Sequence, residues 1–126
     1  MTKFLWLVSA LSLVGVSAHA QQSEPQVDDT QVAMCMVVSS GIYNIANEHQ
    51  AGVSKQKAQR QLDRDINNLS KRFSDKNFIG FVGDSWKNGL SIIYGMPVQD
   101  SAEDKEAFVK AVLDRAFVAC LDDLGA

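Results

Sequence analysis

Two cysteines, Cys35 and Cys120, constrain the fold of this chain more than any other feature of its sequence. They stand near the two ends of the region that shows helical periodicity. In an exported protein, two cysteines most simply form one disulfide. We therefore predict a Cys35–Cys120 bond that brings the first and last elements together. The alternative is a pair of buried free thiols.

The N-terminal sequence indicates export. Lys3 precedes an apolar run over residues 4–16, and Ala18-His19-Ala20 has the small-x-small pattern of a cleavage site. The run is too short for a membrane span. We predict a cleaved signal peptide over residues 1–20, a flexible segment over 21–29 and one helical domain over 30–126. The predicted location is the periplasm or the exterior of the cell.

The charge of the mature chain argues against one class of partner. Removal of residues 1–20 takes away Lys3 and leaves 11 basic against 15 acidic residues, a net charge of −4. Nucleic-acid-binding proteins of this size present a strongly basic face and a basic total. We therefore expect no nucleic-acid partner.

Apolar residues recur at helical spacing in four segments, which are residues 32–49, 54–73, 78–95 and 101–124. Short connections between four helices favour antiparallel neighbours. The prediction is an all-α fold, a small four-helix bundle with up-down-up-down topology. The first and fourth helices are then antiparallel neighbours, which places Cys35 and Cys120 at the same end.

The third segment permits a second interpretation. Phe78, Val82, Trp86, Leu90 and Ile93 keep a helical rhythm. Asn88-Gly89, however, is the strongest short hairpin signal, and glycines in a helix interior are unfavourable. The longer helical rhythm favours a helix. The alternative is a β-hairpin over residues 78–95, which would make the fold α+β.

The fourth segment carries more apolar surface than contact with a single neighbouring helix would bury. Its apolar residues form two adjoining stripes, Phe108, Val112, Ala116, Ala119 and Cys120, and Val109, Leu113, Phe117, Leu121 and Leu124. Together the stripes cover roughly half of the helix circumference, which is more than an ordinary surface helix buries. We expect this helix to contact several neighbours.

The sequence offers no catalytic or metal-binding pattern. His49 is the single histidine after residue 20, and it lies about four helical turns beyond Cys35 on the same helix. No H-x-x-x-H or C-x-x-C spacing occurs. We predict no enzyme activity, no metal site and no cofactor. A hydrolase that uses paired carboxylates is the least favoured hypothesis.

Charge and aromatic patterns supply five candidate partner-binding residues. Between Ser54 and Lys76 the chain has seven basic and three acidic residues, and four of the basic ones share a helix face. This face is either a solvated surface or a docking face for an acidic partner. The apolar third segment is either core or a groove for a partner or a second copy. The candidates are Lys57, Arg60, Arg64, Lys71 and Trp86.

These features predict a small exported helical protein that acts by binding. We expect an envelope accessory protein, or an inhibitor or immunity-type protein, that docks on another envelope or secreted protein. The alternative is a carrier of a small apolar ligand, which requires a cavity of a few hundred Å³ or more.

Overall fold

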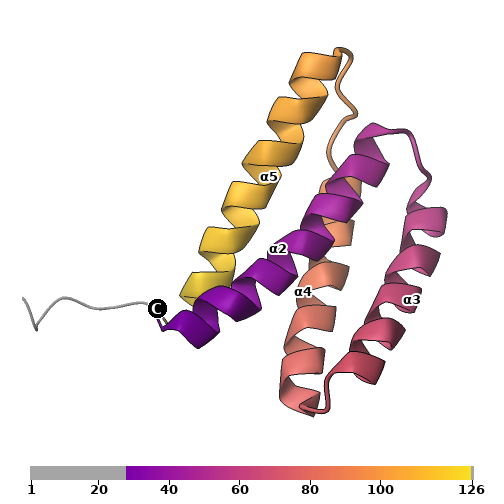
Figure 1. Cartoon of the computed structure of the whole chain (residues 1–126). Coiled ribbons are helices and arrows are strands. Elements are labelled where there is room, and N and C mark those ends of the chain that lie inside the picture. The colour runs from indigo at the N-terminus through magenta and orange to yellow at the C-terminus, as the bar shows by residue number, and fades with distance from the viewer. Residues whose placement is uncertain (1–27, 126) are drawn as a thin grey trace, which may run out of the picture.

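The computed structural model describes residues 28–125. The predicted signal peptide and nearly all of the predicted flexible segment lie outside these residues. The described residues form four α-helices, labelled in Figure 1 as α2 (Asp29–Gln50), α3 (Lys55–Arg72), α4 (Lys76–Tyr94) and α5 (Ala102–Asp123). No strand occurs between residues 28 and 125, so the all-α prediction is confirmed.

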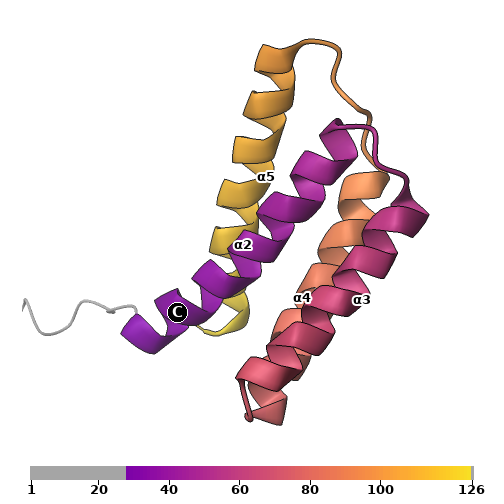
Figure 2. The same ribbon diagram turned by 45° about the vertical axis from the view of Figure 1, so that its right-hand side comes forward.

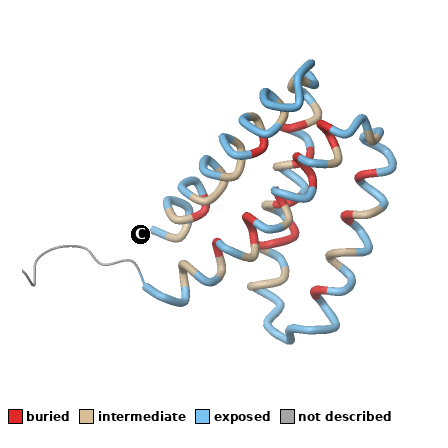
Figure 3. Tube along the Cα trace, turned by 45° about the horizontal axis from the view of Figure 1, so that its top comes forward, coloured by how far each residue is buried: buried red, intermediate tan, exposed pale blue. Residues whose placement is uncertain are grey.

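Helix α2 is the centre of the bundle. Successive helices alternate in direction, as Figures 1 and 2 show, and α2 packs against α5, α4 and α3. Eight residues of α2 are buried, compared with two in α5. Figure 3 shows the buried positions gathered along α2 and the sides of its neighbours that face it. The core therefore lies around α2 rather than midway between four equal helices.

Side chains at the helix starts explain why the boundaries follow from the sequence. Asp28, Ser54, Asp75 and Ser101 each accept a hydrogen bond from a backbone N–H of the first turn that follows. These N–H groups have no partner within the helix, so such caps stabilise its start. Past the end of α2, Gly52 has φ 82°, the left-handed conformation that glycine adopts without strain.

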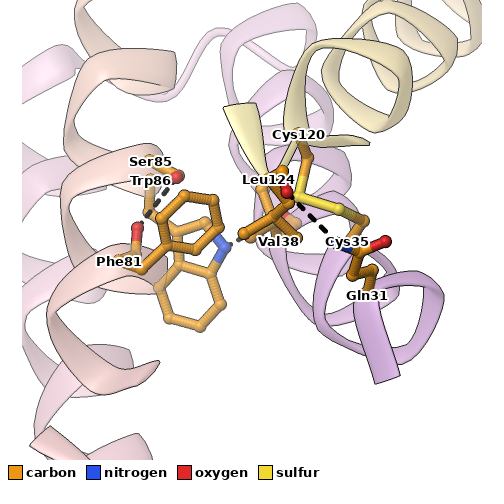
Figure 4. The surroundings of a disulfide bond; sticks show 8 residues. All are labelled: Gln31, Cys35, Val38, Phe81, Ser85, Trp86, Cys120 and Leu124. Carbon is orange, nitrogen blue, oxygen red and sulfur yellow. Dashed lines mark hydrogen bonds between the residues drawn. A yellow bond between two sulfur atoms is a disulfide. The ribbon is translucent and has the colours of Figure 1, made fainter. Parts of the chain in front are cut away.

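The disulfide joins the start of α2 to the end of α5, as predicted. Cys35 and Cys120 are bonded, their Cα atoms are 5.6 Å apart, and both residues are buried. Beside the bond, Gln31 Nε2 donates to the carbonyl of Leu124 at 3.1 Å (Figure 4). The two helix ends are thus tied both covalently and by a hydrogen bond.

Polar contacts tie the same two helices at their other ends. Lys105 Nζ donates to the carbonyl of Gln50 at 2.9 Å, which places an ammonium at the carboxyl end of α2, where positive charge is favourable. Gln50 Oε1 accepts from the backbone N–H of Gln99 at 2.9 Å. The ring of His49 is buried beside Tyr94 and Phe108.

The third segment is a continuous helix, and the hairpin alternative is wrong. Helix α4 runs through Asn88 and Gly89 without interruption. A Cβ atom at Gly89 would overlap the Cδ1 atom of Ile42 on α2, and one at Gly83 would touch Ile66 of α3 at 3.6 Å. Gly89 therefore lets α2 approach α4 closely and serves packing rather than a turn, whereas a Cβ atom at Gly83 would make only an ordinary van der Waals contact.

A second close approach fixes α2 on α4. A Cβ atom at Gly41 would overlap the indole ring of Trp86, whose Nε1 donates to the carbonyl of Val38 at 2.9 Å (Figure 4). The indole is therefore held between the two helices by both shape and a hydrogen bond.

Removal of the disulfide should lower the free energy of unfolding substantially. The bond closes a loop with a sequence separation of 85 residues, for which the chain-entropy estimate is about 4–5 kcal/mol. We expect urea unfolding of a C35A/C120A variant to show a loss of this order as an upper value. A loss below ~1 kcal/mol would show that the bond does not hold α5 in place.

Two glycine-to-alanine substitutions should act in opposite directions. Gly41→Ala must displace the Trp86 indole and should destabilise the protein by about 2 kcal/mol. Gly80→Ala, also within a helix, meets no atom within 4 Å and should stabilise by up to ~1 kcal/mol. Chemical denaturation of both variants measures the two changes. Equal effects would contradict the packing described for Gly41.

Candidate functional site: an apolar groove between α4 and α5

Helices α4 and α5 both pack on α2, but they do not pack along each other. A groove of about 530 Å³ lies between them. Its floor includes Val38 and Ile42 of α2, Ile93 of α4 and Cys120 of α5, all buried in the core. The groove is therefore a gap between helices that has an apolar base.

The groove walls are continuous helix faces. On α5, lining residues recur at intervals of three and four from Phe108 to Asp123, a length of about 22 Å. On α4 they recur in the same way from Ser85 to Ile93, about 12 Å, and Met96 lines the groove just past the end of the helix. The groove thus extends along about two turns of α4 and four turns of α5.

The groove has an apolar interior and a polar rim. Its walls include the small residues Gly89, Ala111, Ala116 and Ala119, and the wall residue Ile92 is 61% exposed. The polar residues that line it are Ser85, Asn88, Arg115 and Asp123. The Ser85 hydroxyl already donates to the carbonyl of Phe81 at 2.8 Å (Figure 4).

The groove accounts for the surplus apolar surface predicted on the last helix. We expected several neighbours for this segment, but α2 is the helix it packs against extensively. The stripe that contains Phe108, Val112 and Ala119 instead faces the groove. The sequence pattern gave the amount of apolar surface on α5 correctly and its neighbours incorrectly.

The predicted basic residues lie elsewhere. Lys57, Arg60, Arg64 and Lys71 are all exposed on α3, and α3 contributes no residue to the groove. The structure brings these four side chains to one face of one helix, as their spacing predicts.

Carboxylates of the protein itself lie beside part of this basic face. Burial and the nearby Asp65 carboxylate raise the pKa of Glu48, whereas Arg64 and Lys57 act to lower it. Gln61 bridges two of these groups, because its amide donates to Asp65 at 2.9 Å and accepts from Arg64 at 2.7 Å. Two of the four predicted cations therefore act on internal acidic partners.

The structure does not bring Trp86 together with the basic residues. Its side chain is buried against Gly41, with its N–H bonded to α2.

The cysteines and the histidine are also engaged elsewhere. Both cysteines are in the disulfide, and His49 Nδ1 lies 3.0 Å from the Gln50 amide. Among the described residues, no three His, Cys, Asp or Glu side chains group closely enough to hold a metal ion. No helix in that part of the chain combines the length and apolar character needed to cross a membrane.

Glu48→Gln should raise stability at neutral pH. The folded-state pKa of Glu48 lies above the ordinary 4.5, so this group favours folding below that pH and loses the contribution as pH rises through its folded-state value. The amide cannot ionise, so the variant should melt at a higher temperature than wild type at pH 7. The difference should vanish near pH ~4.

Glu106→Gln, at an exposed carboxyl on α5, is the matched control for this comparison. Thermal unfolding of the three proteins across this pH range measures the effect. A Glu48→Gln variant that is less stable at pH 7 would mean that attraction to Lys57 and Arg64 outweighs burial.

The function of this chain has to be derived from its own residues. No family model matches the sequence, and neither a curated protein nor a solved structure matches it.

Proposed function

We propose that the protein is an exported binding protein whose groove between α4 and α5 holds an amphipathic helix of another protein. The observation that carries the proposal is the groove itself, which is long, apolar at its base and open along its side. Grooves of this kind bind helices through apolar residues at positions i, i+3 or i+4, and i+7.

The small wall residues favour a helix as the occupant. Packed helices have axes about 8–10 Å apart, and the shorter distances require small side chains at the contact. Gly89 on one wall and Ala116 and Ala119 on the other provide such positions. Aliphatic side chains of a partner helix would then reach the floor at Val38 and Ile42.

The rim supplies two charges that would orient the partner. Arg115 and Asp123 are both exposed, and they lie eight residues, about 12 Å, apart along α5. A partner helix with an acidic and a basic residue about two turns apart would match them in one direction only. The exposed basic residues of α3 would add a longer-range attraction for an acidic partner.

The disulfide supports an extracytoplasmic setting, because such bonds persist in oxidising compartments. An envelope accessory protein, or an inhibitor or immunity-type protein, acts by occupying a site on another protein. A long apolar groove with charged residues on its rim fits that role.

A small apolar ligand is the second candidate occupant. The volume of about 530 Å³ falls within the usual range for ligand pockets, which is roughly 300–1,000 Å³. Such pockets enclose most of the ligand, however, whereas Ile92 on the wall is largely exposed. The open side therefore favours a helix.

A cross-linking experiment with a matched pair of variants tests the proposal. A photoreactive residue in place of Ile92 should cross-link to one protein in the cells that make this chain. That protein, purified, is then titrated against wild type, Ala119→Arg and Ala107→Arg. Ala119 lines the groove and Ala107 does not, although both are exposed on α5.

We expect Ala119→Arg to weaken binding about tenfold or more, because the arginine fills the groove, and Ala107→Arg to change it less than about twofold. Equal losses in the two variants would overturn the groove as the binding site. Binding of fatty acid that Ala119→Arg abolishes, with no protein cross-linked, would establish the carrier function instead.

A further inference from the structure

His49 is buried where three helices meet. The residue is 4% exposed at the end of α2, and its ring centre lies 4.8 Å from that of Tyr94 on α4 and 5.7 Å from that of Phe108 on α5. It is the single histidine after residue 20, and histidine is the side chain that ordinarily gains a proton between about pH 5 and 8. Neither the groove nor the disulfide uses this capacity.

The Gln50 side chain connects His49 to the linker between α4 and α5, residues 95–101. Gln50 Oε1 accepts from the backbone N–H of Gln99 at 2.9 Å, and Gln50 Nε2 lies 3.0 Å from His49 Nδ1. A backbone N–H can only donate, so the amide oxygen has to face Gln99 and the amide NH₂ group has to face His49. His49 Nδ1 therefore accepts this hydrogen bond, which requires that the nitrogen carry no proton.

A proton on His49 Nδ1 does not fit this pair of hydrogen bonds. Both nitrogens of an imidazolium ring donate, so Nδ1–H would meet the NH₂ group of Gln50. If the Gln50 amide turns over, its oxygen can accept from His49, but its NH₂ group then meets the Gln99 N–H. One of the two hydrogen bonds is lost in either case.

We infer that His49 is a pH-sensitive switch: when its imidazole gains a proton, the Gln50 amide turns toward it and the linker between α4 and α5 is released from α2. The Gln99 N–H then bonds to water. The attached state binds one proton fewer than the released state, so attachment weakens as the pH falls below about 6.5, the ordinary value for histidine.

Two neighbouring helices contribute titratable groups beside the ring. On α5, the Lys105 ammonium donates to the Gln50 carbonyl at 2.9 Å, and it opposes a second positive charge nearby. On α4, burial and the charge of Glu48 raise the pKa of Tyr94 above its ordinary 10.0, so this hydroxyl is neutral when histidine titrates. Neither group can accept the proton that Nδ1 would carry in place of Gln50.

The acidic groups of this region lie off the ring. On α2 itself, Glu48 is the neighbour of His49, and burial raises the pKa of its carboxyl. The groups of α3 that act on Glu48 are Asp65, Arg64 and Lys57. The linker contributes Asp100, which is exposed. Among the described residues, no carboxylate is hydrogen-bonded to the ring, so Gln50 alone decides which form of Nδ1 is accommodated.

The switch lies at one end of the groove between α4 and α5. Met96 of the linker and Phe108 beside the His49 ring both line that groove. Release of the linker therefore loosens this end, and a bound partner helix would be held less tightly in acid. This consequence rests on the proposed function, whereas the switch is a property of the protein alone.

Amide hydrogen exchange of the mature protein, with no partner added, tests the switch. The protection factor of the Gln99 N–H, corrected for the intrinsic pH dependence of exchange, is compared at about pH 7.5 and about pH 5.5. We expect about tenfold lower protection at the acidic pH, which is one unit below the ordinary value for histidine. The Lys57 N–H, which donates to the Ser54 hydroxyl at 3.2 Å, is the internal reference and should keep its protection.

Two variants of similar shape separate the switch from other effects of acid. His49→Asn keeps an acceptor near the position of Nδ1 but cannot gain a proton, so the protection of Gln99 should change less than about twofold with pH. Gln50→Glu supplies two carboxylate oxygens, which can accept from Gln99 and from a protonated His49 together. Protection should therefore not fall in this variant. Circular dichroism at about pH 7.5 confirms that both variants are folded.

Three results would overturn the switch, namely no fall in the wild type, an equal fall in His49→Asn or an equal fall in Gln50→Glu. Each of them leaves the groove as the binding site unaffected, because Ala119→Arg tests that site separately. A fall in the wild type alone would support the switch even if the groove bound no partner.

Discussion

The pairing of α5 with α2 is the contact on which the rest of the structure depends. Helix α5 has two fully buried residues, Val109 and Cys120, and its partly buried apolar residues, among them Phe117 and Leu121, pack against the core. The disulfide fixes one end of the pair, and the Lys105 ammonium on the last carbonyl of α2 fixes the other. The groove uses α5 as one of its walls. Its geometry therefore depends on how α5 is held against α2.

Much of the fold could be predicted from the sequence because its determinants are local. Capping residues such as Ser54 and Ser101 mark helix starts, and the two cysteines specify one long-range contact. The choice of neighbours could not be predicted in this way. An amphipathic pattern reports how much of a helix is apolar, but not which helix covers it. The fit of Trp86 against Gly41 is likewise a match between two particular shapes, which periodicity does not reveal.

The candidate site was harder to predict than the fold. The sequence directed attention to the basic residues of α3, since a cluster of charge is conspicuous in a protein of mildly acidic total. Ion pairs between exposed charges, however, contribute little free energy in water. Here the positive charges of Lys57 and Arg64 also act on the Glu48 carboxylate of the protein itself. The groove left a subtler sign in the sequence, namely Ala116 and Ala119 within one of the two adjoining apolar stripes of α5. This pattern indicates a helix surface suited to close contact with another helix. Only the structure shows that none of the other described helices packs along this surface.

The Cys35–Cys120 bond has a consequence for the timing of assembly. Before oxidation, the C-terminal helix is retained by noncovalent contacts alone, which are its apolar packing on the core and polar contacts such as that of Lys105. Joining the two thiols ties the end of α5, one wall of the groove, to α2, and it requires an oxidising environment. Formation of the native structure thus includes a chemical step as well as a conformational one, and a chain in a reducing compartment lacks the bond that joins α5 to α2.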